Sequence, residues 1–141
     1  MLGVDLGSRR IGLAVSNATE TLATPLKVLQ RGADHAADHA AILSTAREEE
    51  AQRIVVGWPR SLSGRDGPAA QLVRAEVEEL QNAAGEALPV ELHDERFTTV
   101  TATRHLRDAG KRRTRDMIDA AAAAVILQSY LDAPGRTGSD A

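Results

Sequence analysis

The chain has 141 residues, of which 43% are hydrophobic and 26% charged, and its formal net charge is −3. This length suits one domain with a single core, and the balance of apolar and charged residues is typical of a globular protein rather than a disordered one. The absence of cysteine excludes disulfides, zinc–thiolate sites and cysteine nucleophiles, and no apolar run reaches the length of a membrane span, so we expect a soluble, cytoplasmic protein.

The first thirty residues predict three strands. The runs at 2–7 and 11–16 are short and apolar, and the three residues between them predict an antiparallel hairpin. A third strand is expected over 25–30. The fold should therefore begin with three consecutive strands of which the first two, at least, are antiparallel.

Helices and strands alternate through the rest of the chain. The predicted elements are a helix over 34–50 capped by Asp34, a strand over 53–57, a glycine- and serine-rich loop to 68, a helix over 69–84 ended by Gly85, a strand over 90–94, a short helix over 98–109 and a last helix over 116–131. This order predicts an α/β fold with a mixed sheet flanked by helices. One domain over 1–132 and a flexible C-terminal tail over 133–141 complete the expected organisation.

Three acidic residues are candidate site residues because of where they stand. Asp5 interrupts an apolar strand, where an ionised carboxylate is costly unless a cation, a hydrogen-bond network or exposure on an edge strand compensates it. Glu95 follows the strand that ends at Asp94, and the carboxyl ends of parallel strands are where such sheets place their sites. We interpret Asp94 itself as a turn or capping residue.

The last helix offers two acids in its predicted first turn. Asp119 precedes a run of small residues that can press against the sheet, whereas Asp116 is nearer to a basic loop. Asp119 is therefore the better site candidate and Asp116 the better cap. Three oxygen ligands without cysteine suit a hard cation such as Mg²⁺ or Mn²⁺, and ions of this kind can promote hydrolysis of a phosphodiester.

A cluster of basic residues stands out on this acidic chain. Residues 104–115 contain six basic residues and one acidic residue. We predict that the run before Asp119 binds the backbone of a nucleic acid; its members are Lys111, Arg112, Arg113 and Arg115. Arg10, between the first two strands, is expected to contact a phosphate or to pair with a carboxylate.

Three histidines and one tryptophan are further candidates. His35 and His39 are four apart but lack the intervening glutamate of a zinc-protease motif, so we interpret both as solvent-facing. His93 adjoins the proposed site, and one hypothesis is that it orients Glu95 or stabilises a leaving group. Trp58 is expected to be packed or half-buried rather than to touch a base.

Four motifs in order resemble those of one protein family. They are the segments VDLGSRRIGLAVS at 4–16, VVGWP at 55–59 followed by Gly64 and Gly67-Pro68, HDERFTT at 93–99, and DAAAAAVILQSYL at 119–131. This set resembles the YqgF/RuvX family of Holliday-junction-resolvase-like nucleases and spans most of the chain. Asn17 stands where the family often has Asp, so we assign it no ligand role.

The resemblance implies a fold, an activity and a site. The fold is RNase H-like, with three layers and a mixed five-stranded sheet whose first three strands are antiparallel. Asp5, Glu95 and Asp119 would be the catalytic, metal-binding residues of a nuclease that uses Mg²⁺ or Mn²⁺ and leaves a 5′-phosphate and a 3′-hydroxyl. The implied role is 5′-end processing of precursor 16S rRNA, with RNA as the favoured partner, DNA as a second possibility and the pre-ribosomal particle as an expected assembly.

Three alternatives stay open at this point. The protein could be a Holliday-junction resolvase or single-strand nuclease in DNA repair, and a resolvase would need a homodimer where an RNA nuclease could be a monomer. It could also be a non-catalytic RNA-binding module of ribosome assembly, although that reading leaves the acidic trio unexplained. An actin-like ATPase, suggested by residues 5–8, needs two such domains and is disfavoured by the length.

Overall fold

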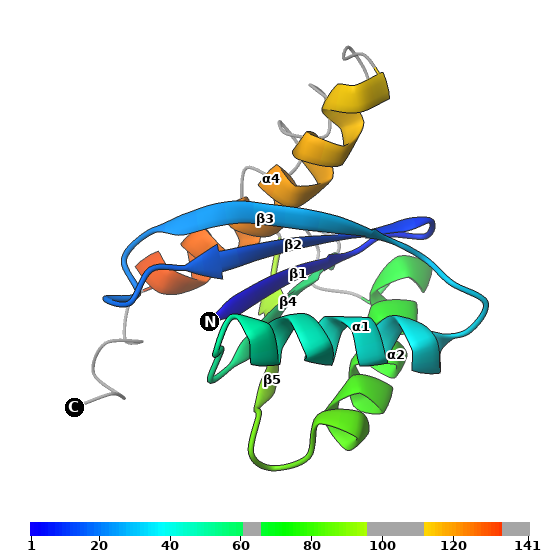
Figure 1. The fold of residues 1–141 in the computed structure, drawn as a ribbon. Helices are drawn as coiled ribbons and strands as arrows, with labels where there is room; N and C mark the ends of the chain where they lie inside the picture. The colour runs from blue at the N-terminus through cyan, green and yellow to red at the C-terminus, as the bar shows by residue number, and fades with distance from the viewer. Residues whose placement is uncertain (61–65, 96–111, 134–141) are drawn as a thin grey trace.

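A five-stranded mixed sheet forms the centre of the computed structural model, which describes residues 1–60, 66–95 and 112–133, with side chains in the last segment from residue 118 (Figure 1). The strands are β1 (Leu2–Leu6), β2 (Arg10–Ser16), β3 (Ala23–Gln30), β4 (Ile54–Trp58) and β5 (Val90–Asp94). Their order across the sheet is β3-β2-β1-β4-β5.

The first three strands are antiparallel, as predicted. β1 and β2 form a hairpin whose register pairs Leu2 with Val15 and Leu6 with Ile11. β3 lies at the sheet edge, where Pro25 opposite Ala14 is tolerated because an edge strand can lack a backbone donor. β4 runs parallel to β1, and β5 runs parallel to β4. In the chain, β4 comes after α1 and β5 comes after α2. Two parallel neighbours need such a connection, because the chain must cross over the sheet before the second strand begins.

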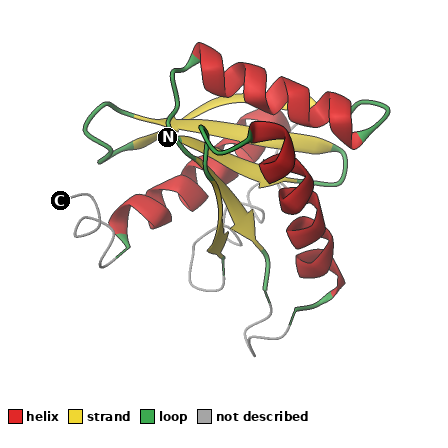
Figure 2. Ribbon diagram, turned by 90° about the horizontal axis from the view of Figure 1, so that it is seen from below, coloured by secondary structure: helices red, strands yellow, loops and turns green. Residues whose placement is uncertain are grey.

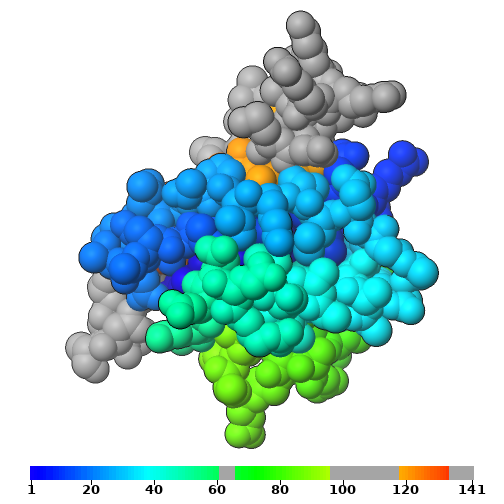
Figure 3. Space-filling view, in the orientation of Figure 1, coloured from blue at the N-terminus to red at the C-terminus, as the bar shows by residue number. Residues whose placement is uncertain are grey.

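Helices α1 (His35–Glu48) and α2 (Pro68–Ala84) cover one face of the sheet, and α4 (Arg112–Asp132) covers the other (Figure 1; from below in Figure 2). Leu2, Val4 and Val56 belong to the core under α1 and α2, whereas Val55 packs with α4. This division follows from the alternation of side chains along a strand. In the space-filling view, β3 and α1 form the middle of the visible surface, and β5 and α2 lie below them (Figure 3).

Small residues bring α4 close to the sheet. A Cβ added at Gly3 would lie 2.7 Å from the Leu127 Cβ, and one at Gly57 would lie 2.5 Å from the Ile126 Cδ1. Ala120, Ala123 and their alanine neighbours supply the facing side of the helix. The close packing of α4 on the sheet therefore depends on the glycines in β1 and β4, which have no side chains to hold the helix away.

Most predicted boundaries are confirmed to within two residues. Asp34 caps α1, accepting a hydrogen bond of 2.8 Å from the Ala37 amide. Gly67 and Pro68 begin α2, and Gly85 ends it with a φ of 74°, a conformation that glycine adopts easily. Trp58 is half-buried as expected, and its indole N–H donates to the Ala70 carbonyl at 3.1 Å.

The start of the last helix was predicted wrongly. α4 begins at Arg112 rather than at 116, so the basic run belongs largely to helix and not to a loop. Asp116 consequently lies inside α4 and is not its cap, and Asp119 lies about two turns in rather than in the first turn. Arginine is a good helix former, so nothing in this run stops the helix before 116.

A second prediction was wrong for one histidine. His35 is exposed as predicted, but His39 is only 3% exposed. Its Nε2 lies 2.9 Å from Glu76 Oε2, and this partner from α2 compensates the burial. The predicted helix over 98–109, Gly64, Lys111 and residues 134–141 lie outside the described residues.

Candidate active site

Asp5 and Asp119 lie on the same face of the sheet, the one that α4 covers. Asp5 alternates with Val4 along β1 and so lies on the same face as Gly3, which contacts α4. Its cross-strand partner is Gly12, and a Cβ added at Gly12 would overlap the backbone carbonyl of Asp119. The backbone of Asp119 therefore lies directly over the neighbour of Asp5.

Glu95 reaches the same face from the end of β5. Its backbone N–H donates to the Trp58 carbonyl at 3.0 Å, which extends the pairing of β5 with β4 by one step. Its Oε2 lies 2.9 Å from the point where a Gly57 Cβ would stand. β4 lies between β1 and β5, so Gly57 separates Asp5 from Glu95 and leaves room for the Glu95 carboxylate above the sheet.

The two carboxylates on β1 and α4 are buried. Asp5 is 9% exposed and Asp119 is 5% exposed. Arg10, at the start of β2, donates from Nε to Asp119 Oδ2 at 2.6 Å, and this ion pair offsets part of the cost of burying the carboxylate. Of the two partners expected for Arg10, the structure therefore pairs it with the carboxylate.

The donor set suits a hard divalent cation, but the oxygens are not gathered around one point. All three acids offer only oxygen ligands, which is the preference of Mg²⁺ and Mn²⁺. In the part of the chain that the structure describes, only His35, His39 and Glu79 bring their ligand atoms within 4.8 Å of one another. Binding of one ion between the three acids therefore requires some of their side chains to rotate.

His93 lies on this face too but serves another part of it. Its Nε2 is 2.9 Å from Ser129 Oγ, and its ring meets that of Tyr130 edge-on at 5.8 Å. Burial lowers the pKa of His93, which favours the neutral ring. Ser129 is ten residues beyond Asp119 on α4, or about 15 Å along the helix. These contacts favour a packing role and do not support the hypothesis that His93 orients Glu95.

A cluster of ion pairs around Trp58, beside β4, is absent from the sequence-based predictions. The guanidinium groups of Arg60 and Arg74 lie 4.5 Å and 5.1 Å from the centroid of the Trp58 ring. Arg60 lies 3.2 Å from Asp66 and 3.6 Å from Asp94, and Arg74 lies 3.5 Å from Asp66, so two carboxylates balance the two cations. Trp58 and Asp94 pair in register, and Trp58 packs on the core under α1 and α2, so this cluster lies on the face opposite to the three acids.

No helix among the described residues is long and apolar enough to cross a membrane.

Comparisons with known proteins agree with one another. The family model described as "RuvX: Holliday junction resolvase" matches residues 1–133. A protein of Rhodococcus erythropolis is 43% identical, with 99% of this chain and 85% of the relative aligned, and one of an Anaeromyxobacter species is 47% identical, with 93% and 95% aligned. Both carry the name "Putative pre-16S rRNA nuclease".

Solved structures share the fold. RuvC of T. thermophilus in complex with a Holliday junction substrate has a TM-score of 0.55 at 17% identity, covering 92% of this chain and 91% of that one. A second structure of Thermus thermophilus RuvC has a TM-score of 0.52 at 14% identity, covering 97% and 95%. The predicted α/β fold of the RNase H-like class, with its mixed five-stranded sheet, is confirmed.

Proposed function

The chain belongs to the RuvX family, described as Holliday junction resolvase, and on this premise we propose that it is a divalent-metal-dependent nuclease that hydrolyses phosphodiester bonds in precursor 16S rRNA. Relatives that are 40–47% identical over nearly the whole chain bear a pre-16S rRNA nuclease name, which favours RNA over DNA. The single observation that carries the proposal is the placement of Asp5, Glu95 and Asp119 on one face of the sheet. We take residues 1–132 as the nuclease domain, acting in the cytoplasm on the pre-ribosomal particle.

We assign the metal ligands to the three acids. Asp5 from β1, Asp119 from α4 and Glu95 after β5 would hold Mg²⁺ or Mn²⁺ between them. Such an ion, when bound, supplies the positive charge that activates an attacking water and neutralises charge developing at the phosphate. α4 packs closely on β1 and β2, so the two elements that carry Asp5 and Asp119 are held against each other.

Arg10 has two partners in this proposal, one before the substrate binds and one after. Without substrate its Nε holds Asp119 Oδ2. A phosphate of the nucleic acid is a second anion that the Arg10 guanidinium can bind. If the guanidinium moved to that phosphate, the Asp119 oxygen would become available to the cation. Arg10 is thereby both a nucleic-acid ligand and the group that exchanges with the ion.

Replacing Arg10 by Gln is expected to raise the affinity for Mn²⁺ several-fold in the absence of nucleic acid. A cation that competes for Asp119 is removed, and the negative charge near the site grows by one. Calorimetric titration with Mn²⁺ measures the change. Weaker binding of Mn²⁺ by the variant would instead show that Arg10 positions Asp119 for the ion.

The basic run at the start of α4 is proposed to follow the nucleic-acid backbone, together with Lys111 before it. Changing Arg112, Arg113 and Arg115 to Gln removes three cations, so the slope of log affinity against log salt for single-stranded RNA should become shallower by about 2. Binding isotherms at several salt concentrations give this slope. Arg47→Gln, an exposed cation on α1 across the sheet, is the control and should leave the slope unchanged. An unchanged slope in the triple variant would remove these residues from the interface.

One cleavage experiment separates the proposed function from its alternatives. The protein is incubated with Mn²⁺ or Mg²⁺ and three labelled substrates: RNA carrying the 5′ leader of 16S rRNA, single-stranded DNA and a four-way DNA junction. Metal-dependent cleavage of the leader RNA supports the proposal. Paired symmetric cuts confined to the junction favour a dimeric resolvase instead, and tight RNA binding without cleavage favours a ribosome-assembly module.

A further inference from the structure

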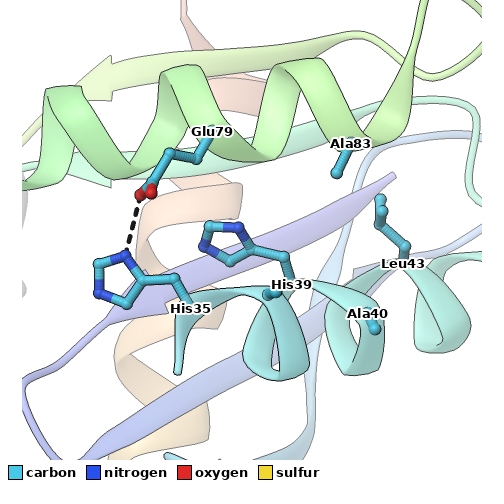
Figure 4. A pocket seen from close by; sticks show the side chains of 7 residues that line it. His35, His39, Ala40, Leu43, Glu79 and Ala83 are labelled. Atoms are coloured by element: carbon cyan, nitrogen blue, oxygen red, sulfur yellow. Dashed lines mark hydrogen bonds and ion pairs between the residues drawn. The ribbon is translucent and has the colours of Figure 1, made fainter. Parts of the chain in front are cut away.

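Two histidines and a glutamate meet on the side of the sheet opposite to the three acids. His35 and His39 are one turn apart on α1, and Glu79 faces them from α2 (Figure 4). His35 Nδ1 lies 2.9 Å from Glu79 Oε2. Each of the three residues offers a ligand atom within 4.8 Å of the others, which no other such group of described residues does.

The surroundings hold one ligand firmly and leave the other two accessible. His39 is 3% exposed, and its Nε2 contacts Glu76, whose carboxylate also accepts from Arg31 at 2.7 Å and 2.9 Å. A carboxylate behind a histidine ring is the usual device that orients a metal-binding imidazole. The His35 and Glu79 side chains are 53% and 55% exposed, so an ion can reach them from water.

Space for an ion is available beside these side chains. A pocket of about 300 Å³ lies between α1 and α2, and its remaining lining is formed by Ala36, Ala40, Leu43 and Ala83. Three of these four residues are alanines, so the two helices are separated here by side chains too short to close the gap. Figure 4 shows Glu79 directed across this gap toward His35, with the His39 ring beside them.

We propose that His35, His39 and Glu79 form a binding site for one transition-metal cation of the Zn²⁺ or Ni²⁺ class, which links α1 to α2. Two imidazoles and one carboxylate are the donors that such borderline ions prefer, whereas Mg²⁺ prefers oxygen alone. The cation takes the place of the proton that bridges His35 Nδ1 and Glu79 Oε2, and that proton is released to solvent. The residues between the histidines lack the glutamate of zinc proteases, so the role is to join two helices rather than to activate water.

The test is calorimetric titration of the full chain with ZnCl₂ and NiCl₂ in the absence of nucleic acid. One ion should bind per chain, and the affinity should fall at least about tenfold in His35→Ala and in Glu79→Gln. Both positions are exposed, so these variants should fold, whereas His39 is buried. Glu78→Gln, at the exposed neighbouring position on α2, is the matched control and should bind as the wild type does.

Two further readouts keep this site distinct from the acidic one. Zn²⁺ should raise the melting temperature of the wild type and of Asp5→Asn equally, and should not raise that of His35→Ala. The site is also independent of the proposed nuclease function, because it lies on the other face of the sheet. Zn²⁺ affinity unchanged in His35→Ala and Glu79→Gln, or no saturable binding by the wild type, would overturn the proposal, and neither result bears on cleavage.

Discussion

Replacing Asp5 by Asn is expected to slow metal-dependent RNA cleavage about a thousandfold, or about 4 kcal/mol of transition-state stabilisation, while the fold is retained. Asn keeps the size of the side chain but removes the charge that an ion needs. Asp5 is buried in β1, so the Asn side chain has to occupy the same place. Single-turnover cleavage of the labelled leader RNA measures the rate, and titration with Mn²⁺ shows whether the ion is still bound.

Asp94→Asn supplies a matched control for this prediction. Asp94 stands at the same edge of the sheet, at the end of β5, but lies 3.6 Å from Arg60 and is interpreted as a structural residue. Its variant is expected to cleave at nearly the wild-type rate. Full activity in Asp5→Asn, or equal losses in both variants, would contradict the assignment of Asp5 as a catalytic ligand.

Replacing Gly12 by Ala is expected to destabilise the protein by about 3 kcal/mol, at the upper end of what an overpacked core costs. The added Cβ would overlap the carbonyl of Asp119. This obstacle is helix backbone and cannot rotate away as a flexible side chain does, so α4 itself must shift. Urea denaturation followed by circular dichroism gives the free energy of unfolding. Cleavage should fall as well, because Asp119 moves with the helix.

Gly67→Ala tests whether the loss at Gly12 is specific to that contact. Nothing lies within 4 Å of a Cβ added at Gly67, so the change should cost less than about 1 kcal/mol, as expected for a helix-capping position. If Gly12→Ala is as stable as the wild type, Asp119 does not lie against β2. In that case Asp119 does not lie beside the strand that pairs with Asp5, and the proposed site is wrong.

The local pattern of the sequence was sufficient to predict the order of strands and helices and to single out Asp5 as a candidate ligand. The RNase H-like arrangement was predicted from the resemblance to the family. Alternation along β1 separates Leu2 and Val4 from Asp5, and a charge in an apolar strand indicates a site before any coordinate is known. Asp34 and Gly85 mark helix ends through contacts made within a few residues of each. Such features depend on short-range geometry, which the order of residues specifies directly. The roles of Asp5, Glu95 and Asp119 as metal ligands all stay predictions.

Only the tertiary structure decided the partners of the charged side chains. Arg10 and Asp119 are 109 residues apart, and their ion pair exists because α4 crosses β2 at Gly12. The prediction that His39 faces solvent is wrong because its partner Glu76 lies 37 residues later, on α2, and the sequence of α1 gives no sign of that contact. A contact between distant segments depends on how helices pack on the sheet, and no local pattern records it. The sequence therefore determined which elements form and which faces they bury, while packing determined which charges meet.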